Sequence, residues 1–277
     1  MGYEKRLNMA FKEAPVLPVY SNSKFALIGD CHRGTGNSND NFLKNQHLYF
    51  AALKHYYNNN YTYIELGDGD ELWENRSMKQ IQEIHSNVFW LLSLFAKENR
   101  LYMLYGNHDM EKKKLSFLDF TFYEGVILKD CYSNNYIHLT HGHQADALNS
   151  VFWKLSRFLV RYFWKPMEQV GILDPTSAAK NYSVHKKTEN RLEHWAKEHQ
   201  TTIITGHTHR SVLDFKNTHY CNTGSCVHPR CITCLEIQNN SIFLVKWSME
   251  AKEDLSLYVS RTILSGPVKL SALKNKI

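Results

Sequence analysis

The chain lacks an apolar run long enough to cross a bilayer. Its most apolar stretch, Val88 to Ala96, is about half of the ~20 residues that a span needs, and Ser93 interrupts it. There is no charged-then-apolar leader before Lys24, no internal repeat and no low-complexity tract. We therefore expect neither a membrane-spanning protein nor a repeat protein.

Cysteine is also scarce, with six residues in a chain of 277. Without a leader, this number favours free thiols in a reducing cytoplasm, so a cytoplasmic location is expected. Cys221, Cys226, Cys231 and Cys234 contain only one true C-x2-C pair, which does not favour a zinc ribbon. A strand is expected over 232–237, and it would point Cys231 and Cys234 to opposite faces.

Long blocks of one charge are missing too, apart from Lys112 to Lys114. The net charge of +6 suits anionic ligands. The sequence shows no row of Lys and Arg residues that would follow a nucleic-acid groove, so nucleic acid is not expected as a partner. Hydrophobic residues make up 43% and charged residues 22%, the balance of a globular protein with a large core. A single domain over 1–277 is the simplest prediction.

Five short apolar or β-branched runs predict strands, with helical patterns between the early ones. They are 25–28, 61–66, 101–105, 136–140 and 202–205. A helix is expected from Ser77 to Asn99, opening with a capping box, and a hairpin is expected over 232–247 with a polar turn at 238–241. The basic end around Lys269 is predicted to be solvated. The alternation indicates an α/β fold.

Each of the five runs is followed directly by residues that can bind a metal. The segments read G-D-C-H at 29–32, G-D-G-D-E at 67–71, G-N-H-D at 106–109, H-G-H at 141–143 and G-H-T-H at 206–209. Because parallel strands bring the loops at their carboxyl ends to one edge of a sheet, we expect these side chains to meet in a single crevice.

The donors in these loops are carboxylate, amide oxygen and imidazole. Such a mixed set suits Mn²⁺, with Fe or Zn²⁺ possible, better than the all-oxygen shell of Mg²⁺ or Ca²⁺. Seven donors exceed one tetrahedral site, so a pair of divalent ions sharing one carboxylate is predicted.

In this order, the five motifs resemble those of the calcineurin-like metallophosphoesterase family, over about two thirds of the chain. The resemblance implies a four-layer α/β/β/α sandwich. It also implies a hydrolase of phosphate esters or anhydrides, in which a metal-bound hydroxide attacks phosphorus. As a set the motifs are specific, whereas each alone is weak.

The resemblance further implies roles for single residues. Asp30, His32 and His209 would bind the first metal, whereas Asn107, His141 and His207 would bind the second. Asp68 would bridge the two ions. His108 would stabilise the developing charge or protonate the leaving oxygen, and Asp109 would orient its imidazole. Glu71 sits where the family often has a carboxylate outside the set of metal ligands.

Some of these assignments have competitors in the sequence. Asp70 could replace Asp68 as the bridge, although Asp68 follows the apolar run more directly. His143 could compete with His141, or contact a phosphate instead. Arg33 and Arg210 follow two of the motifs and could reach a phosphate, or could be ordinary surface arginines.

The segment 147–199 is predicted to be a helical, cap-like insertion. Its first part, 151–165, places apolar and aromatic residues on one side of a helix and Lys154, Arg157, Arg161 and Lys165 on the other. The simpler interpretation is a helix whose apolar side packs on the domain and whose basic side is solvated. The alternative is a cap over the metals or a peripheral membrane contact.

The nature of the substrate stays open at this stage. The insertion resembles that of UDP-2,3-diacylglucosamine pyrophosphatases, but those enzymes commonly have Arg where this chain has His108. Because of this difference, a lipid-linked pyrophosphate is kept only as a candidate beside a phosphorylated small molecule. A phosphoprotein phosphatase is an alternative, although G-D-x-x-D-R-G is absent as such, and a non-catalytic metal-bound scaffold is another.

Overall fold

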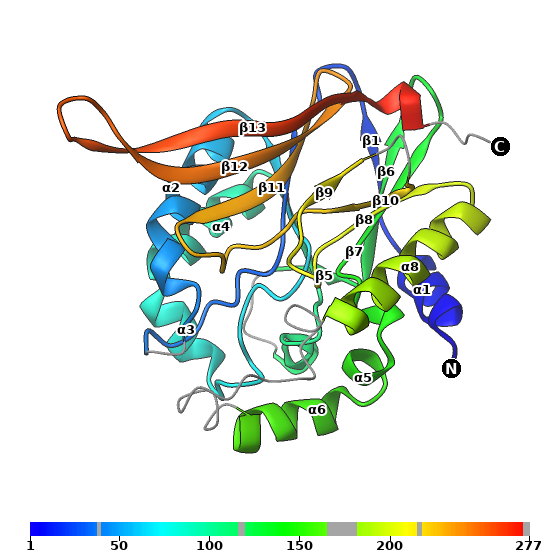
Figure 1. Ribbon diagram of the computed structural model, residues 1–277, viewed down its shortest axis with the longest axis horizontal. Coiled ribbons are helices and arrows are strands. Elements are labelled where there is room, and N and C mark those ends of the chain that lie inside the picture. Colours follow the sequence, from blue (N-terminus) through cyan, green and yellow to red (C-terminus); the bar gives the residue numbers. More distant parts are fainter. Residues whose placement is uncertain (38–39, 116–119, 165–181, 215–217, 274–277) are drawn as a thin grey trace.

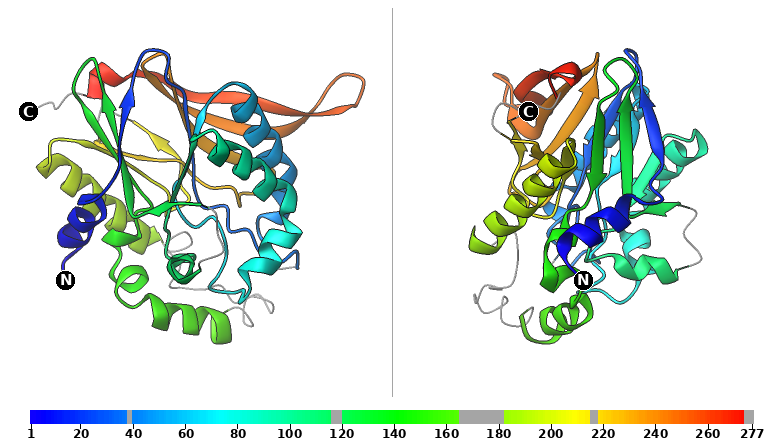
Figure 2. Two further views of the ribbon diagram at one scale, coloured as in Figure 1. Left: turned by 180° about the vertical axis from the view of Figure 1, so that it is seen from behind. Right: turned by 90° about the vertical axis from the view of Figure 1, so that its right-hand side faces the viewer.

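The computed structural model describes residues 1–37, 40–115, 120–164, 182–214 and 218–273. Two mixed β-sheets pack face to face, and helices cover their outer faces (Figures 1 and 2). This is the α/β arrangement that the sequence predicted. Within the described ranges, no helix is both long and apolar enough to span a membrane.

The first sheet has six strands, and helices α1 (Tyr3–Phe11) and α8 (Tyr182–Glu198) pack on it. In spatial order its strands are β1 (Val16–Val19), β6 (Gly125–Asp130), β7 (Tyr136–Thr140), β8 (Thr202–Thr205), β10 (Tyr220–Asn222) and β9 (Val212–Leu213). Strands β7, β8 and β10 run parallel to one another.

The second sheet has seven strands and is covered by α2 (Gln46–Asn58), α3 (Met78–Ile84) and α4 (Ser86–Lys97). Its order is β13 (Leu257–Lys269), β12 (Ser241–Ala251), β11 (Cys231–Gln238), β2 (Phe25–Ile28), β3 (Thr62–Glu65), β4 (Leu101–Leu104) and β5 (Phe122–Tyr123). Strands β2 to β5 are parallel.

Alternate residues of the central strands enter different cores. In β2, Leu27 faces the core between the sheets, whereas Ala26 and Ile28 face the core under α2 and α4. A strand that is buried on both faces must be apolar throughout, which explains why the predicted runs lack the usual polar alternation. A third, smaller core joins α1 and α8 to the first sheet around Trp195.

The helix predicted from Ser77 to Asn99 is interrupted. Ser77 caps α3 by accepting a hydrogen bond from the Gln80 amide at 3.2 Å, as the capping box requires, but the helical path breaks at His85. The His85 ring is fully buried and lies 3.1 Å from the Asp40 carboxylate. Ile84, directly before the break, is half exposed.

The predicted hairpin is present as β11 and β12, closed by the pair Gln238 and Ser241. Asn239 and Asn240 both have positive φ, at 50° and 53°, as a two-residue turn of this hand requires. Lys269 is exposed, as expected of a solvated end, and Lys274 and Lys276 of the same stretch lie outside the described residues. Strand β13 pairs with β12 up to Lys269, and Leu270 and Leu273 of the short helix η5 (Leu270–Leu273) are buried.

The remaining short helices lie beyond the carboxyl ends of the central strands or beside α2. They are η1 (Leu43–Asn45), η2 (Met110–Lys114), η3 (His143–Ala145), α5 (Ala147–Ser150), α6 (Trp153–Leu159) and the π-helical turn η4 (Val160–Trp164). The described parts of 147–199 are thus mainly helical, and α6 lies below the two sheets in Figure 1.

Candidate metal centre

The loops that follow β2, β3, β4, β7 and β8 meet at one end of the two sheets. They bring together the seven predicted ligands, all buried or nearly so: Asp30, His32, Asp68, Asn107, His141, His207 and His209. Five of the seven have positive φ, between 48° and 69°. Left-handed backbone is costly for residues with a Cβ atom and concentrates at functional sites, so these loops are shaped to aim their side chains inward.

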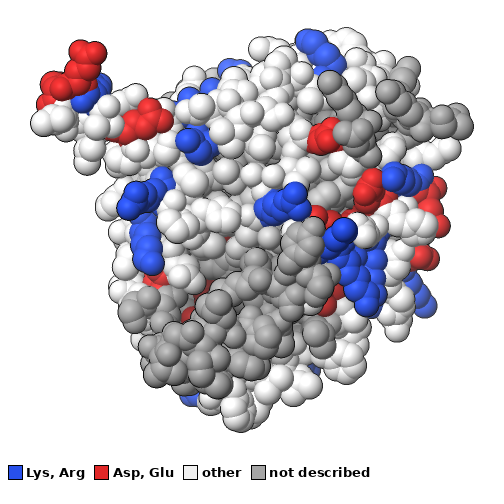
Figure 3. Space-filling model, viewed as in Figure 1, with Lys and Arg blue, Asp and Glu red and all other residues white. Residues whose placement is uncertain are grey.

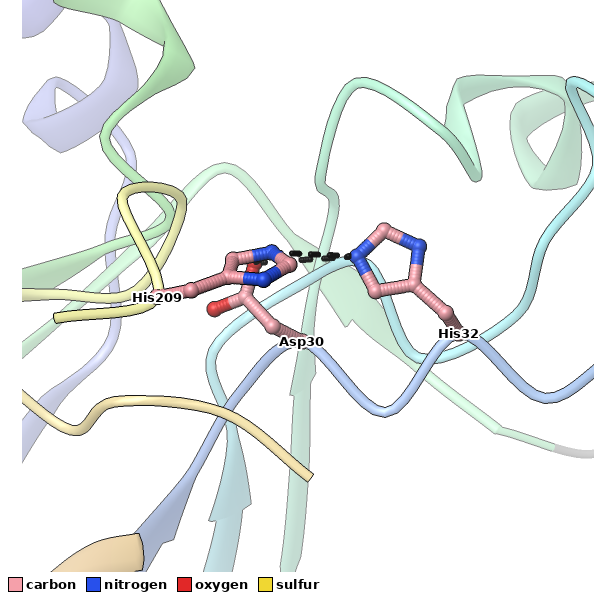
Figure 4. A group of neighbouring side chains, drawn as sticks. All are labelled: Asp30, His32 and His209. Carbon is pink, nitrogen blue, oxygen red and sulfur yellow. Dashed lines mark hydrogen bonds and ion pairs between the residues drawn. The ribbon is translucent and has the colours of Figure 1, made fainter. Parts of the chain in front are cut away.

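Asp30, His32 and His209 form the first group of donors (Figure 4). Nε2 of His209 lies 3.1 Å from Oδ1 of Asp30 and 3.3 Å from Nε2 of His32. The backbone amide of His207 donates to Asp30 Oδ2 at 2.9 Å and holds the carboxylate in place. Two imidazole nitrogens facing one buried carboxylate make a cage suited to a divalent cation.

The second group consists of Asp68, His141 and His207, with Asn107 beside them. Nε2 of His141 lies 3.1 Å from Asp68 Oδ2 and 3.1 Å from Asn107 Oδ1. Nδ1 of His141 faces the Leu66 carbonyl at 2.9 Å, which fixes the proton there and leaves Nε2 for the site. Nε2 of His207 is buried and has no hydrogen-bond partner, which suits a nitrogen that binds a cation.

Asp68 is the member of the second group that also approaches the first. Its Oδ2 is 3.1 Å from Nε2 of His141 and 3.9 Å from Nε2 of His32. Burial alone would raise the pKa of Asp68, but His141 and His108 outweigh it and hold that pKa well below the usual range. Asp68 is therefore an ionised carboxylate placed where a bridging ligand would have to be.

Asp70 occupies a different position and does not compete for the bridge. It is fully buried, 2.7 Å from Nε of Arg33 and 2.6 Å from Nζ of Lys112. Despite its burial, these two cations lower the pKa of Asp70 to about 2. Asp70 belongs to an ion-pair network behind the site.

Arg33 belongs to the same network, which corrects the expectation that it could reach a phosphate. Its guanidinium is fully buried and donates to Glu65 at 2.8 Å through both terminal nitrogens, and to Asp70 through Nε. A bidentate pair of this kind occupies the donors that would otherwise meet a phosphate. The side chain ties the loop after β2 to the loop after β3.

His108 is held by Glu71 and Trp73. Its Nδ1 lies 2.8 Å from the Glu71 carboxylate, and its ring stacks on Trp73 with centroids 4.1 Å apart. The same carboxylate lies 2.8 Å from Nδ1 of His32. Burial opposes a charge on His108, but Glu71 and Asp68 outweigh it and raise its pKa to about 10.

The expectation that Asp109 orients His108 is therefore wrong. Asp109 points to the opposite side, where it accepts hydrogen bonds from the amides of Gly106 at 2.7 Å and Gly69 at 3.1 Å. Lys112 closes this arrangement at 2.7 Å from Asp109. Asp109 thus connects the loop after β4 to the loop after β3. The carboxylate that contacts His108 is that of Glu71, in the loop after β3.

Sequence reasoning overlooked Lys112 and Trp73. Lys112 was counted as part of a basic run, yet its side chain is buried between Asp70 and Asp109. Its spacing of three residues from Asp109 was the available signal, because residues three apart share a helix face. Nothing in the sequence pointed to the stacking of Trp73.

The two other predicted substrate contacts differ in exposure. His143 is buried beside His141, with ring centroids 5.5 Å apart, and its Nδ1 has no hydrogen-bond partner. Burial, together with His141 and His207, keeps the pKa of His143 well below its ordinary value. Arg210 is exposed directly after His209 and is available for an anionic ligand.

The insertion contacts the site loop through its basic side. Arg161 donates to the carbonyls of Leu72 and Trp73 at 2.7 Å each, and Arg157 pairs with Glu111. The simpler interpretation is wrong for the apolar side, because Leu155 and Phe158 are about half exposed; on the basic side Lys154 is exposed, whereas Arg157 and Arg161 are partly buried. The Arg161 guanidinium thus supplies hydrogen-bond donors to backbone carbonyls of the loop after β3. Lys165 lies outside the described residues.

All six cysteines are free thiols. Cys234 is buried in the core under α2, and within the described residues no group of donors that could hold a metal includes a cysteine. The strand that argued against a zinc ribbon is present as β11.

Comparison with known proteins agrees with this geometry. Residues 23–211 match the family described as calcineurin-like phosphoesterase. Because that match covers more than half of the chain, the protein belongs to this family. No curated protein sequence matches it significantly. Among solved structures, it is similar to the crystal structure of Chaetomium thermophilum Vps29, with 13% identity, a TM-score of 0.42, and coverage of 87% of this chain and 96% of that one.

Proposed function

We propose that this protein is a metal-dependent hydrolase of a phosphate ester or pyrophosphate bond, with two divalent ions in its site. The observation that supports this most strongly is the pair of donor groups that meet at Asp68, whose Oδ2 lies within 3.9 Å of a histidine nitrogen in each. Two cations sharing a carboxylate are typical of two-metal hydrolases.

The donor chemistry fits such ions. Asp30, His32 and His209 would hold the first cation, whereas Asn107, His141 and His207 would hold the second. Mixed oxygen and nitrogen donors favour Mn²⁺, with Fe or Zn²⁺ as the other choices. Bound there, two divalent ions would supply water that ionises near neutral pH and positive charge to offset that of the phosphate.

His108 is the residue that we assign to proton transfer. Glu71 accepts a hydrogen bond from Nδ1–H of His108, so that Nε2–H of the protonated ring is free to donate to the oxygen of the leaving group. Trp73 stacks on one face of the ring and limits its rotation. The His108 side chain is 21% exposed, so a substrate can approach it from solvent.

Arg210 and His143 are the residues that we assign to the substrate. Exposed Arg210 is placed to meet phosphate oxygens, and His143 lies beside His141 on the other side of the site. The proposed substrates are phosphorylated small molecules or lipid-linked phosphates. The assay must determine whether the scissile phosphate carries one ester bond or two.

The test is hydrolysis of p-nitrophenyl phosphate and of its bis ester by Mn²⁺-loaded protein. The Asp68→Ala variant should lose both metal and turnover. His108→Ala should keep its metal and lose about 10²- to 10⁴-fold in turnover. Asp254→Ala, at an exposed hairpin tip, is the matched control and should change neither. Bound metal without turnover of either ester would favour a scaffold, and preferential turnover of a phosphopeptide would favour a phosphoprotein phosphatase.

A further inference from the structure

The segment 151–163, which contains α6 and most of η4, turns apolar side chains outward. Six large side chains in it are each about half exposed: Val151 at 50% and Phe152 at 53%, directly before α6, then Leu155 at 55%, Phe158 at 51%, Tyr162 at 50% and Phe163 at 54%. We call these six residues the apolar stripe. Scattered exposed apolar residues are ordinary on protein surfaces, but a continuous group along one helix marks an interaction surface.

The stripe is fixed to the body of the protein. Arg161 bonds to the carbonyls of Leu72 and Trp73, Arg157 pairs with Glu111, and Arg76 donates to the Tyr162 hydroxyl at 2.9 Å. Because the two arginines of the helix are engaged beneath it, the helix cannot roll to bury its apolar side without breaking these contacts. The outward orientation is therefore built into the fold.

Positive charge is concentrated around the stripe. The helix and the two segments that it contacts, 72–79 and 110–114, together carry eight Lys or Arg residues and two Glu residues. Four of the eight pair with carboxylates: Lys79 with Glu83, Lys112 with Asp70 and Asp109, Lys113 with Glu124, and Arg157 with Glu111. Lys112 is buried against Asp70 and Asp109, whereas Arg76, Lys79, Lys114 and Lys154 are exposed.

This charge decides between the occupants of such a surface. If a second copy of the chain packed on the stripe about a two-fold axis, the lysines and arginines around the two stripes would face each other, and their electrostatic repulsion would oppose association. An anionic surface with an apolar interior satisfies both features at once, because aromatic side chains enter the acyl boundary while Lys and Arg meet the headgroups. In Figure 3, the described residues at the lower edge, where α6 lies in Figure 1, show few charged atoms.

We propose that the apolar stripe is a docking surface for an anionic lipid bilayer. The helix would lie in the plane of the headgroups, with the stripe inserted and the surrounding lysines and arginines at the phosphates. Arg161 links this helix directly to the loop that carries Glu71 and Trp73, so docking would hold the metal centre next to the membrane surface. That the substrate is a phosphate ester within that surface rests on the proposed function.

The test is cosedimentation of the Mn²⁺-loaded protein with vesicles of phosphatidylcholine containing about one third phosphatidylglycerol. The protein should bind these vesicles, and it should bind pure phosphatidylcholine at least about tenfold more weakly. The double variant Leu155→Gln and Phe158→Gln should lose about tenfold or more in the partition coefficient. Both positions are exposed, and glutamine is a good helix former, so folding should be preserved.

The control is Leu255→Gln with Leu257→Gln, at the tip of the hairpin between β12 and β13. These leucines are 84% and 70% exposed and lie far from α6 (Figure 1), so this variant should bind vesicles like the wild type. Turnover of p-nitrophenyl phosphate should be unchanged in both double variants. Absence of vesicle binding, or equal loss in both variants, overturns the docking proposal. An inactive wild type that still binds vesicles overturns only the hydrolase function.

Discussion

The carboxylate of Glu71 lies 2.8 Å from Nδ1 of His32 and 2.8 Å from Nδ1 of His108. One acidic side chain thus orients both a predicted metal ligand and the predicted proton donor. Burial would raise the pKa of Glu71, but the two histidines outweigh it and hold that pKa far below its ordinary value. The Glu71 carboxylate is therefore negatively charged, and it keeps a proton on Nδ1 of each ring, which leaves Nε2 for the site.

The first prediction concerns the variant Glu71→Gln. The amide keeps the shape of the side chain but removes its charge, so His108 loses the group that favours its protonated form. Turnover should fall by about 10- to 100-fold, and metal affinity should fall as well, because His32 loses the same partner. Steady-state assays with metal titration measure both effects.

Asp109→Asn is the comparison for that variant. Asp109 accepts bonds from Gly106 and Gly69 rather than from His108, so this change should lower stability more than it alters the pH dependence of turnover. If instead Asp109→Asn shifts the pH profile and Glu71→Gln leaves it unchanged, the assignment of Glu71 is incorrect.

The second prediction concerns Lys112→Met. Lys112 is buried with Asp70 and Asp109, and its removal leaves two buried carboxylates short of a cation. The free energy of unfolding should fall by about 3–5 kcal/mol, as is usual when one partner of a buried ion pair is deleted. Urea denaturation measures the change.

Lys79→Met is the matched control for Lys112→Met. Lys79 is 80% exposed and forms only a long surface pair with Glu83. Its removal should change the free energy of unfolding by less than about 0.5 kcal/mol. Similar losses in both variants would show that the buried network has no special importance for stability.

The third prediction concerns pH. Burial, with a smaller effect of His199, lowers the pKa of His138 to about 4. In the unfolded chain this pKa is about 6.5, so the unfolded state binds more protons between these two values. Stability should therefore fall as the pH falls from about 6.5 toward 4, by about 3 kcal/mol from this group.

The variant His138→Gln removes that titration. The Nδ1 atom of His138 lies 2.8 Å from the Thr201 hydroxyl, a contact that glutamine can replace in part. The free energy of unfolding of the variant should depend less steeply on pH over this interval, whatever its value at neutral pH. Parallel pH curves for wild type and variant would rule out His138 as the source.

The fourth prediction concerns Gly67→Ala. Gly67 has φ of +85°, and an added Cβ would lie 2.7 Å from the Gly106 amide nitrogen and 2.9 Å from Cβ of His141. The cost should exceed about 2 kcal/mol, because both backbone strain and overlap oppose the change. Thermal unfolding and Mn²⁺ binding should both weaken. Gly2→Ala, which meets nothing within 4 Å, is the control and should leave both unchanged.

The secondary structure that leads into the site was predictable from the sequence. Strands β2, β7 and β8 have the predicted bounds, and β3 and β4 are shorter by one or two residues at their ends. Short apolar runs that are buried on both faces cannot form stable helices of their own, so a strand is the structure that the sequence predicts. The break at His85 could not be predicted, because it depends on Asp40, which is distant in sequence.

The sequence by itself determined which residues stand at the strand ends, and so which donors meet around Asp68. That follows because a parallel strand delivers its next residues to one edge of the sheet. Only the tertiary structure decided the partners of the charged groups. Glu71 rather than Asp109 contacts His108, Arg33 is buried, and the arginines of the insertion face inward. Each of these outcomes depends on which side chains of other loops come within about 3 Å, a distance that spacing along the chain does not set.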